Sequence, residues 1–69
     1  MGVKELDTVA LLKDMPAHNL EKGDVGTVVT VLDDHTVEVE FIDQSGSTKA
    51  FLPLTDRDYI RLNLETLAD

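Results

Sequence analysis

The densest cluster of side chains that could do chemistry is Asp33-Asp34-His35. Carboxylates and imidazoles are ligands that metal ions accept, and Asp43 is a candidate for a further ligand. A metal site needs ligands that converge from fixed positions, and consecutive residues at a hairpin tip rarely converge. Aspartate side chains also bond to the backbone of turns. The sequence therefore favours a turn at this cluster, and we expect no metal ion or other cofactor.

The chain has few residues that could act as a catalytic nucleophile. Cysteine is absent, and the two serines, Ser45 and Ser47, flank a turn at Gly46. His18 falls in a long loop, and no motif places a nucleophile near it. A small five-stranded barrel also has a filled interior, with no pocket of a few hundred Å³. We therefore expect that the protein is not an enzyme, and that His18 is either solvated or part of a binding surface.

Glu38 and Glu40 lie on one face of an expected strand, where they alternate with valines. Paired carboxylates can do acid–base work when burial raises one pKa, but this alternation predicts that both face solvent. On the solvent side they extend an acidic stripe with Asp33, Asp34 and Asp43. Such a stripe is a candidate for the recognition of a basic protein partner.

The net charge of the chain restricts the kinds of partner that it is expected to bind. It has 69 residues, with 14 acidic residues against 6 basic ones and a net charge of −8. Nucleic acids and anionic membranes are disfavoured, because both are bound by clustered lysine and arginine. The acidity serves either solubility or a basic protein partner. No apolar run reaches the roughly 20 residues that span a bilayer, and the absence of cysteine fits a reducing compartment, so we expect a cytoplasmic protein.

Residues 25–32 and 37–42 are rich in β-branched residues and predict two central strands. A three-residue loop at 33–35 places Val31 opposite Val37 and Val29 opposite Val39, whereas a two-residue loop mixes valines with charges on both faces. Burial should select the longer loop, because a slip of one residue exchanges the two faces. The predicted apolar face is Val29, Val31, Val37, Val39 and Phe41, and His35 would adopt the left-handed conformation.

The remaining elements complete an all-β pattern. Further strands are expected at residues 8–12, 48–54 and 59–63, with Pro53 marking an edge strand. Thr55 should cap a short helical turn before the last strand by accepting a hydrogen bond from the backbone near Asp58. We predict a five-stranded SH3-like barrel as a single domain over residues 1–69, with its core at about 6–63 and a tail at 64–69. The loop at 13–23 is long for so small a domain, and such loops often carry function.

Two aromatic residues complete the set of candidate binding residues. Phe51 is on the opposite side of its strand from Leu52 and Leu54, and Tyr59 follows the helical turn. Exposed aromatics of SH3-like barrels bind peptides, but Phe51 could instead close one end of the barrel and Tyr59 could pack over the turn. The residues that we consider for partner binding are His18, Asp33, Asp34, Glu38, Glu40, Asp43, Phe51 and Tyr59.

The segments 6–16 (LDTVALLKDMP), 22–29 (KGDVGTVV) and 37–41 (VEVEF) carry a resemblance to known proteins. Together they resemble a family of small bacterial proteins catalogued as domain of unknown function 4926, over roughly residues 6–62. The resemblance implies a small β-barrel with no assigned activity, cofactor or site. Members of the family tend to have glycine near the position of His35, a difference that concerns the geometry of the turn.

The segment 23–28 (GDVGTV) is also similar to KOW-type barrels, which bind RNA or proteins of the ribosome and of transcription. The basic residues that such modules use for RNA are missing here, and the glycines serve any barrel in which backbones approach closely. The leading hypothesis is a protein-interaction module, either an adaptor or an acidic inhibitor of a basic partner such as a toxin. A KOW-like nucleic-acid or ribosome-associated module is the alternative.

Overall fold

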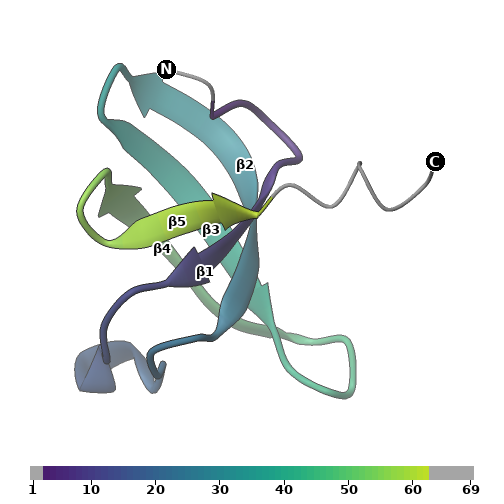
Figure 1. Cartoon of the computed structure of the whole chain (residues 1–69). Coiled ribbons are helices and arrows are strands. Elements are labelled where there is room, and N and C mark those ends of the chain that lie inside the picture. The colour runs from purple at the N-terminus through teal and green to yellow at the C-terminus, as the bar shows by residue number, and fades with distance from the viewer. Residues whose placement is uncertain (1–2, 63–69) are drawn as a thin grey trace, which may run out of the picture.

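Five antiparallel strands form one sheet in the order β4-β3-β2-β1-β5 (Figure 1). The computed structural model describes residues 3–62, so the predicted tail at 64–69 lies outside the described residues. Each strand ends within one residue of its expected bounds where it is described, and the long first loop holds a short 3-10 helix, η1. The elements are β1 (Thr8–Leu11), η1 (Pro16–His18), β2 (Val25–Asp33), β3 (Thr36–Ile42), β4 (Thr48–Thr55) and β5 (Tyr59–Leu62).

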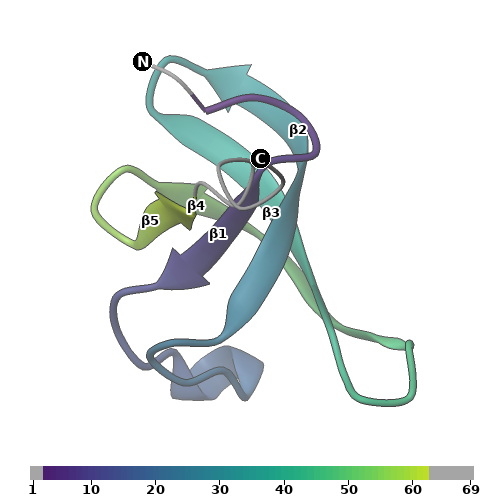
Figure 2. The same ribbon diagram turned by 45° about the vertical axis from the view of Figure 1, so that its right-hand side comes forward.

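The sheet coils so that β1 and β5 lie across from β3 and β4, with the core between them (Figures 1 and 2). The meander β2-β3-β4 forms one side, and β5 returns to pair with β1 rather than with β4. The predicted all-β, five-stranded SH3-like fold is therefore confirmed. No ladder joins β4 to β5 in the described part of the chain, so the coil is open along this seam.

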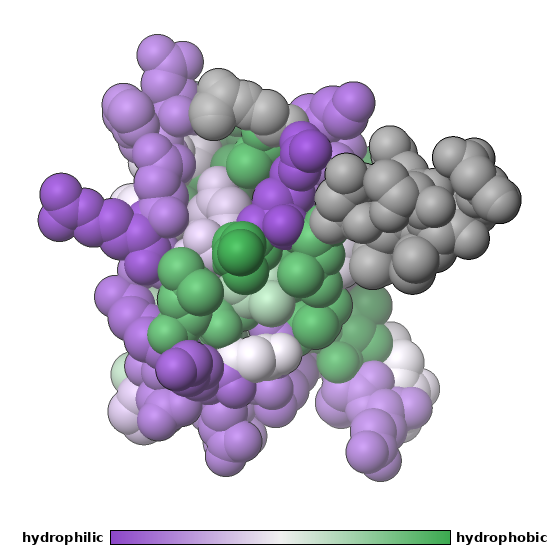
Figure 3. All heavy atoms as spheres, viewed as in Figure 1, coloured by the Kyte–Doolittle hydropathy of each residue, from purple (hydrophilic) through white to green (hydrophobic). Residues whose placement is uncertain are grey.

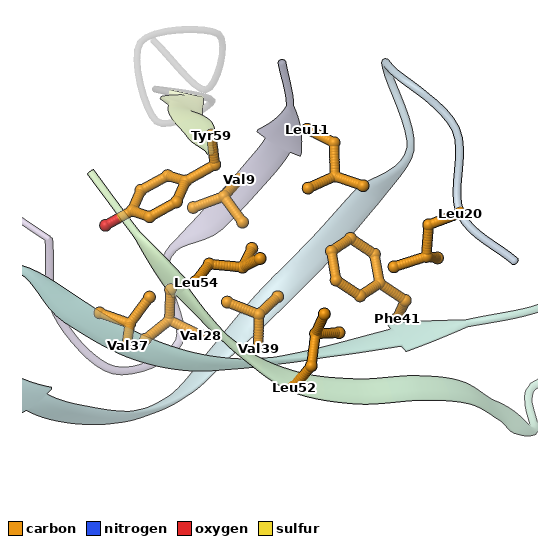
Figure 4. Close-up of a cluster of buried hydrophobic side chains, with 10 residues drawn as sticks. All are labelled: Val9, Leu11, Leu20, Val28, Val37, Val39, Phe41, Leu52, Leu54 and Tyr59. Carbon is orange, nitrogen blue, oxygen red and sulfur yellow. The ribbon is translucent and has the colours of Figure 1, made fainter. Parts of the chain in front are cut away.

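Ten apolar side chains fill the space inside the coil (Figure 4). They come from all five strands and from the first loop, and they are Val9, Leu11, Leu20, Val28, Val37, Val39, Phe41, Leu52, Leu54 and Tyr59. Glu38 and Glu40 alternate with the buried residues of β3 and face outward, as predicted. The edge position of β4, which contains Pro53, is also confirmed.

The predicted register of β2 and β3 is correct at one end and wrong at the other. Val31 lies opposite Val37 as expected, but Val39 lies opposite Val28 instead of Val29. A β-bulge at Val29 adds a residue to β2 and bends the strand, which changes the residues that face inward. Val28 is consequently buried, whereas the side chains of Val29 and Val31 are 40% and 42% exposed.

The connection between β2 and β3 is also shorter than predicted. Asp33 pairs with Thr36 across a second bulge at Leu32, so the loop is the two residues Asp34-His35. The prediction that His35 is left-handed is wrong, because its φ angle is not positive. The bulge supplies the extra residue that we expected in the loop, and it relieves the turn of a left-handed residue.

Gly26 is required by the close approach of β2 to β3. A Cβ atom at this position would lie 2.7 Å from Val39 Cγ1, 2.8 Å from Phe41 Cε2 and 2.9 Å from the carbonyl oxygen of Glu40. Two of these atoms belong to core side chains and the third to the backbone, so none of them can move away to make room for the Cβ atom. Gly46 is different, because its φ angle of 91° suits a turn and nothing lies within 4 Å of its added Cβ.

We expect Gly26→Ala to lower the free energy of unfolding by about 1–3 kcal/mol, because the methyl group overpacks the core between β2 and β3. Urea unfolding measured by circular dichroism tests this. Gly46→Asn is the matched control and should change stability by less than about 0.5 kcal/mol, since asparagine tolerates positive φ angles. Equal losses in the two variants would contradict the packing explanation.

Candidate functional site

An open groove of about 760 Å³ lies between the β2–β3 turn and the β4–β5 turn. The interior of the sheet is filled, but the expectation that the chain has no hollow of this size is wrong for its surface. The groove walls are apolar and come from Val3, Val31, Val37 and Tyr59. Its polar lining residues are Asp33, Asp34, His35, Thr36 and Asp56. The groove thus combines apolar walls with a rim dominated by carboxylates.

Two residues of the groove walls, Val37 and Tyr59, also belong to the core. Figure 4 shows Val37 and Tyr59 at the same end of the core, with the Tyr59 phenol oxygen directed away from the other core side chains. Burial raises the pKa of Tyr59, and the charges of Asp56 and Asp58 add to this effect. Of the two alternatives for Tyr59, packing against the core is the one observed, although its ring also lines the groove.

A pair of reciprocal hydrogen bonds joins the two turns. His35 Nδ1 lies 2.9 Å from Asp56 Oδ2, and the backbone N–H of Asp56 donates to the carbonyl oxygen of His35 at 3.2 Å. The hydrogen bond to Asp56 raises the pKa of His35, and the charges of Asp56, Asp34 and Asp33 act in the same direction. These bonds continue the β3–β4 ladder beyond the Thr36–Thr55 pair, so the two turns that border the groove are tied together by the pairing of β3 with β4.

Asp33 fixes the conformation of the β2–β3 turn. Its Oδ1 atom accepts the backbone N–H of His35 at 2.8 Å. This bond lowers the pKa of Asp33, which keeps the carboxylate charged at the rim. The Asp34 carboxylate, by contrast, accepts no hydrogen bond from residues 3–62 and stands exposed on the rim.

Asp58 fixes the β4–β5 turn and links it to the first loop. Its carboxylate accepts the Thr55 backbone N–H at 2.8 Å, the Thr55 hydroxyl at 3.1 Å and Lys13 Nζ at 2.8 Å. The predicted helical turn is a simple hydrogen-bonded turn instead, in which the Asp58 backbone N–H donates to the Thr55 carbonyl oxygen at 2.9 Å. The predicted side-chain capping is reversed, because the Asp58 carboxylate accepts and the Thr55 hydroxyl donates. Partial burial acts to raise the pKa of Asp58, but Lys13 and the two bonds from Thr55 outweigh it and lower the pKa.

The other candidate residues lie elsewhere on the surface. Glu40 is opposite Phe51, and Glu38 is opposite Pro53, on the outer face of β3 and β4. Phe51 is 53% exposed and does not close an end of the barrel, in contrast to one of the two alternatives considered for it. The expected acidic stripe is thus divided between the groove and the outer face.

Asp43 and His18 are each remote from the groove in the fold. Asp43 lies at the far end of β3 from Asp33, where its Oδ1 atom accepts the Ser45 hydroxyl at 2.6 Å and two backbone N–H groups. These bonds lower the pKa of Asp43 and hold its turn together. His18 is exposed on η1. Within residues 3–62, no three acidic or histidine side chains are grouped so that they could hold a metal ion.

Sequence reasoning missed the part that Asp56 and Val3 have in this site. His35 was considered only as a turn residue or a metal ligand, and Asp56 only as part of a helical turn. No local pattern places residue 35 beside residue 56, because their proximity depends on the register of β3 against β4, in which Thr36 pairs with Thr55. The available signal was the expected pairing of the strands at 37–42 and 48–54. The turns that precede the first of these strands and follow the second should then lie side by side.

The fold and the groove define a small SH3-like β domain with an acid-rimmed surface site. The chain belongs to the family described as domain of unknown function (DUF4926), whose model matches residues 5–61. The resemblance inferred from the sequence motifs is thereby confirmed. Searches of curated proteins and of solved structures gave no match. No helix in the described part of the chain is long and apolar enough to cross a membrane.

We expect Asp58→Ala to lower the free energy of unfolding by about 2 kcal/mol, because hydrogen bonds to a charged group contribute about 1.5–3 kcal/mol. Chemical unfolding at neutral pH measures this loss. Asp34→Ala removes a carboxylate from the neighbouring turn without breaking a hydrogen bond to residues 3–62, and it should change stability by less than about 0.5 kcal/mol. A loss in Asp34→Ala as large as that in Asp58→Ala would show that charge, not hydrogen bonding, sets the effect.

We expect Asp56→Asn to lower the pKa of His35 toward its ordinary value of 6.5, and Asp34→Asn to lower it less. A raised pKa means that the folded chain binds the proton more tightly than the unfolded chain does. The pair therefore stabilises the fold fully below pH 6.5, and this stabilisation is lost as pH rises through the raised pKa of folded His35. NMR measurement of the His35 ring-proton shifts against pH, in the original chain and in the two variants, tests this order of pKa values. An unchanged pKa of His35 in Asp56→Asn contradicts it.

Proposed function

We propose that this chain is a protein-interaction module that binds a basic segment of a protein partner in the groove. The observation that carries the proposal is the combination of apolar walls with a carboxylate rim in one hollow. A lysine or arginine of the partner would meet the rim, and a neighbouring apolar side chain would meet Val31, Val37 and Tyr59. The groove is open rather than enclosed, which suits side chains that project from a larger surface.

The charges near the groove support a basic partner. Asp34 and Asp56 are exposed, and among residues 3–62 His35 is the one lining residue that can carry a positive charge, which Asp56 already engages. The net charge of −8 adds a long-range attraction for basic surfaces. Electrostatic complementarity of this kind raises the rate of encounter and excludes acidic partners.

The proposed groove site also implies a functional class for the protein. The proposal makes it a binding protein, not an enzyme, that acts in the cytoplasm as an adaptor or as an inhibitor of its basic partner. Nothing in the geometry favours the nucleic-acid alternative, since Lys13, Lys49 and Arg61 each lie beside an aspartate. A nucleic-acid site would need such cations to face a phosphate backbone together.

A peptide titration followed by NMR amide shifts tests this function. The probe is a short synthetic peptide that alternates lysine and valine. Matched peptides replace lysine by glutamate or valine by serine, which separates the effect of charge from that of the apolar walls. We expect the lysine–valine peptide to bind most tightly, with shifts at the residues that line the groove, and added salt to weaken it.

Two variants locate the binding on the chain. Asp34→Asn should raise the dissociation constant of the lysine–valine peptide by about fivefold, since a charge pair at about 4 Å in water contributes about 1 kcal/mol. Glu38→Gln removes the same charge from the outer face and should leave the constant unchanged. Equal effects of the two variants, or shifts centred on Glu38 and Glu40, would assign the binding to the outer face and reject the groove.

A further inference from the structure

His35 and Asp56 lie on the boundary between two hollows of the surface. Both residues line the groove, and both also line a second open hollow of about 500 Å³ together with Thr55 and Arg57. Figure 3 shows hydrophilic side chains gathered over the two turns that carry them, at the left of the view in Figure 1. A cation that approaches Asp56 from the groove therefore meets the imidazole of His35 as well.

The backbone fixes the position of this imidazole. Thr36 and Thr55 form the last pair of the β3–β4 ladder, and His35 and Asp56 lie next to each other just beyond it. The backbone N–H of Asp56 donates to the His35 carbonyl oxygen at 3.2 Å, and Asp33 Oδ1 accepts the His35 backbone N–H at 2.8 Å. His35 Nδ1 is thereby held 2.9 Å from Asp56 Oδ2. A neutral ring protonated at Nδ1 and a charged ring can both donate to this carboxylate, so protonation changes the charge here without breaking the contact.

We propose that the protonation state of His35 regulates binding in the groove. A charged ring neutralises Asp56 and weakens the binding of a basic segment, whereas a neutral ring leaves the charge of Asp56 to the lysine or arginine of the partner. This role of His35 rests on the proposed function, because it concerns the same groove and the same kind of partner. It adds the residue that regulates the binding and the direction in which pH acts.

The charged groups around the ring come from the two turns. Asp56 faces it from the β4–β5 turn, and Asp34 and Asp33 act on it from the β2–β3 turn. Arg57 lines the second hollow beside the pair and keeps its positive charge throughout the pH range in which proteins fold. The hydrogen bond to Asp56 and the charges of the three aspartates raise the pKa of His35 from 6.5, so the ring loses its charge above that pH.

The ring is the part of the lining whose charge changes around neutral pH. The hydrogen bond from the His35 backbone lowers the pKa of Asp33, so this carboxylate stays ionised there. Burial raises the pKa of Tyr59 from 10.0, so its phenol stays neutral. A charged ring offsets one of the three carboxylates of the lining, and a neutral ring offsets none of them. A basic segment therefore meets a more negative groove as pH rises.

Exposure to solvent limits the size of this effect. The side chains of His35 and Asp56 are 78% and 56% exposed, so water screens their charges. A single charge at a distance of a few ångströms in water changes a dissociation constant by about fivefold. We expect a difference of this size between the charged and the neutral ring, and a smaller one as salt is added.

The test is a titration of the full chain with the lysine–valine peptide from about pH 5.5 to about pH 9, a range in which lysine side chains stay charged. NMR methyl shifts of the groove valines, Val31 and Val37, give the dissociation constant, which should fall about fivefold as pH rises through the pKa of His35. Peptide binding and proton binding are linked reciprocally. The pKa of His35, measured from its ring-proton shifts, should therefore be lower in the peptide complex than in the free chain, by the logarithm of the ratio of the two constants.

The two histidines of the chain provide a matched pair of variants. His35→Gln keeps a side-chain donor beside Asp56 but cannot change its charge, so its dissociation constant should stay the same at every pH, close to that of the original chain at high pH. His18→Gln removes the other histidine, which is exposed on η1, and should keep the full pH dependence. Dispersed amide spectra confirm that each variant is folded.

The possible results separate this role of His35 from the proposed function itself. Groove binding that does not depend on pH, or a pH dependence that persists in His35→Gln, overturns the role of His35 and leaves the groove as a binding site. A pH dependence that disappears in His18→Gln overturns it as well. A peptide that fails to bind at every pH, or that shifts only residues outside the groove, overturns both proposals.

Discussion

A sheet that has no helix to cover it can bury its apolar face only against itself, and this constraint shapes the whole molecule. No α-helix is present in residues 3–62, so the apolar sides of β1 and β5 must face those of β3 and β4. Coiling of this degree needs local devices in the strands. The bulge at Val29 bends β2, and Gly26 lets β2 approach the Val39 and Phe41 side chains of β3. The core, the open seam and the groove all follow from this bend.

Polar side chains hold the two turns at one end of the sheet, where the strand ladders stop. The His35–Asp56 pair extends the pairing of β3 with β4 beyond Thr36 and Thr55. Asp58 fixes the β4–β5 turn by accepting from Thr55, and it binds Lys13 of the first loop. The same carboxylates that fasten the turns also border the groove. Structure and candidate function therefore draw on one set of residues, and in the proposed mode of binding a partner cation would compete with His35 for Asp56.

The sequence predicts local features well and the meeting of distant ones poorly. The strand bounds, the turn at Gly46 and the outward glutamates of β3 follow from alternation and turn chemistry, which are local properties. The position of the bulge at Val29 does not, because it depends on where a closing sheet needs to bend. For that reason the register was right at Val31 and wrong at Val29.

The candidate site shows the same division between local and distant signals. Asp33, Asp34 and Tyr59 were all recognised as candidates, and the fold brings them to one groove. Asp56 was not recognised, because its link to His35 spans 21 positions of the chain and exists only once β3 and β4 have paired in register.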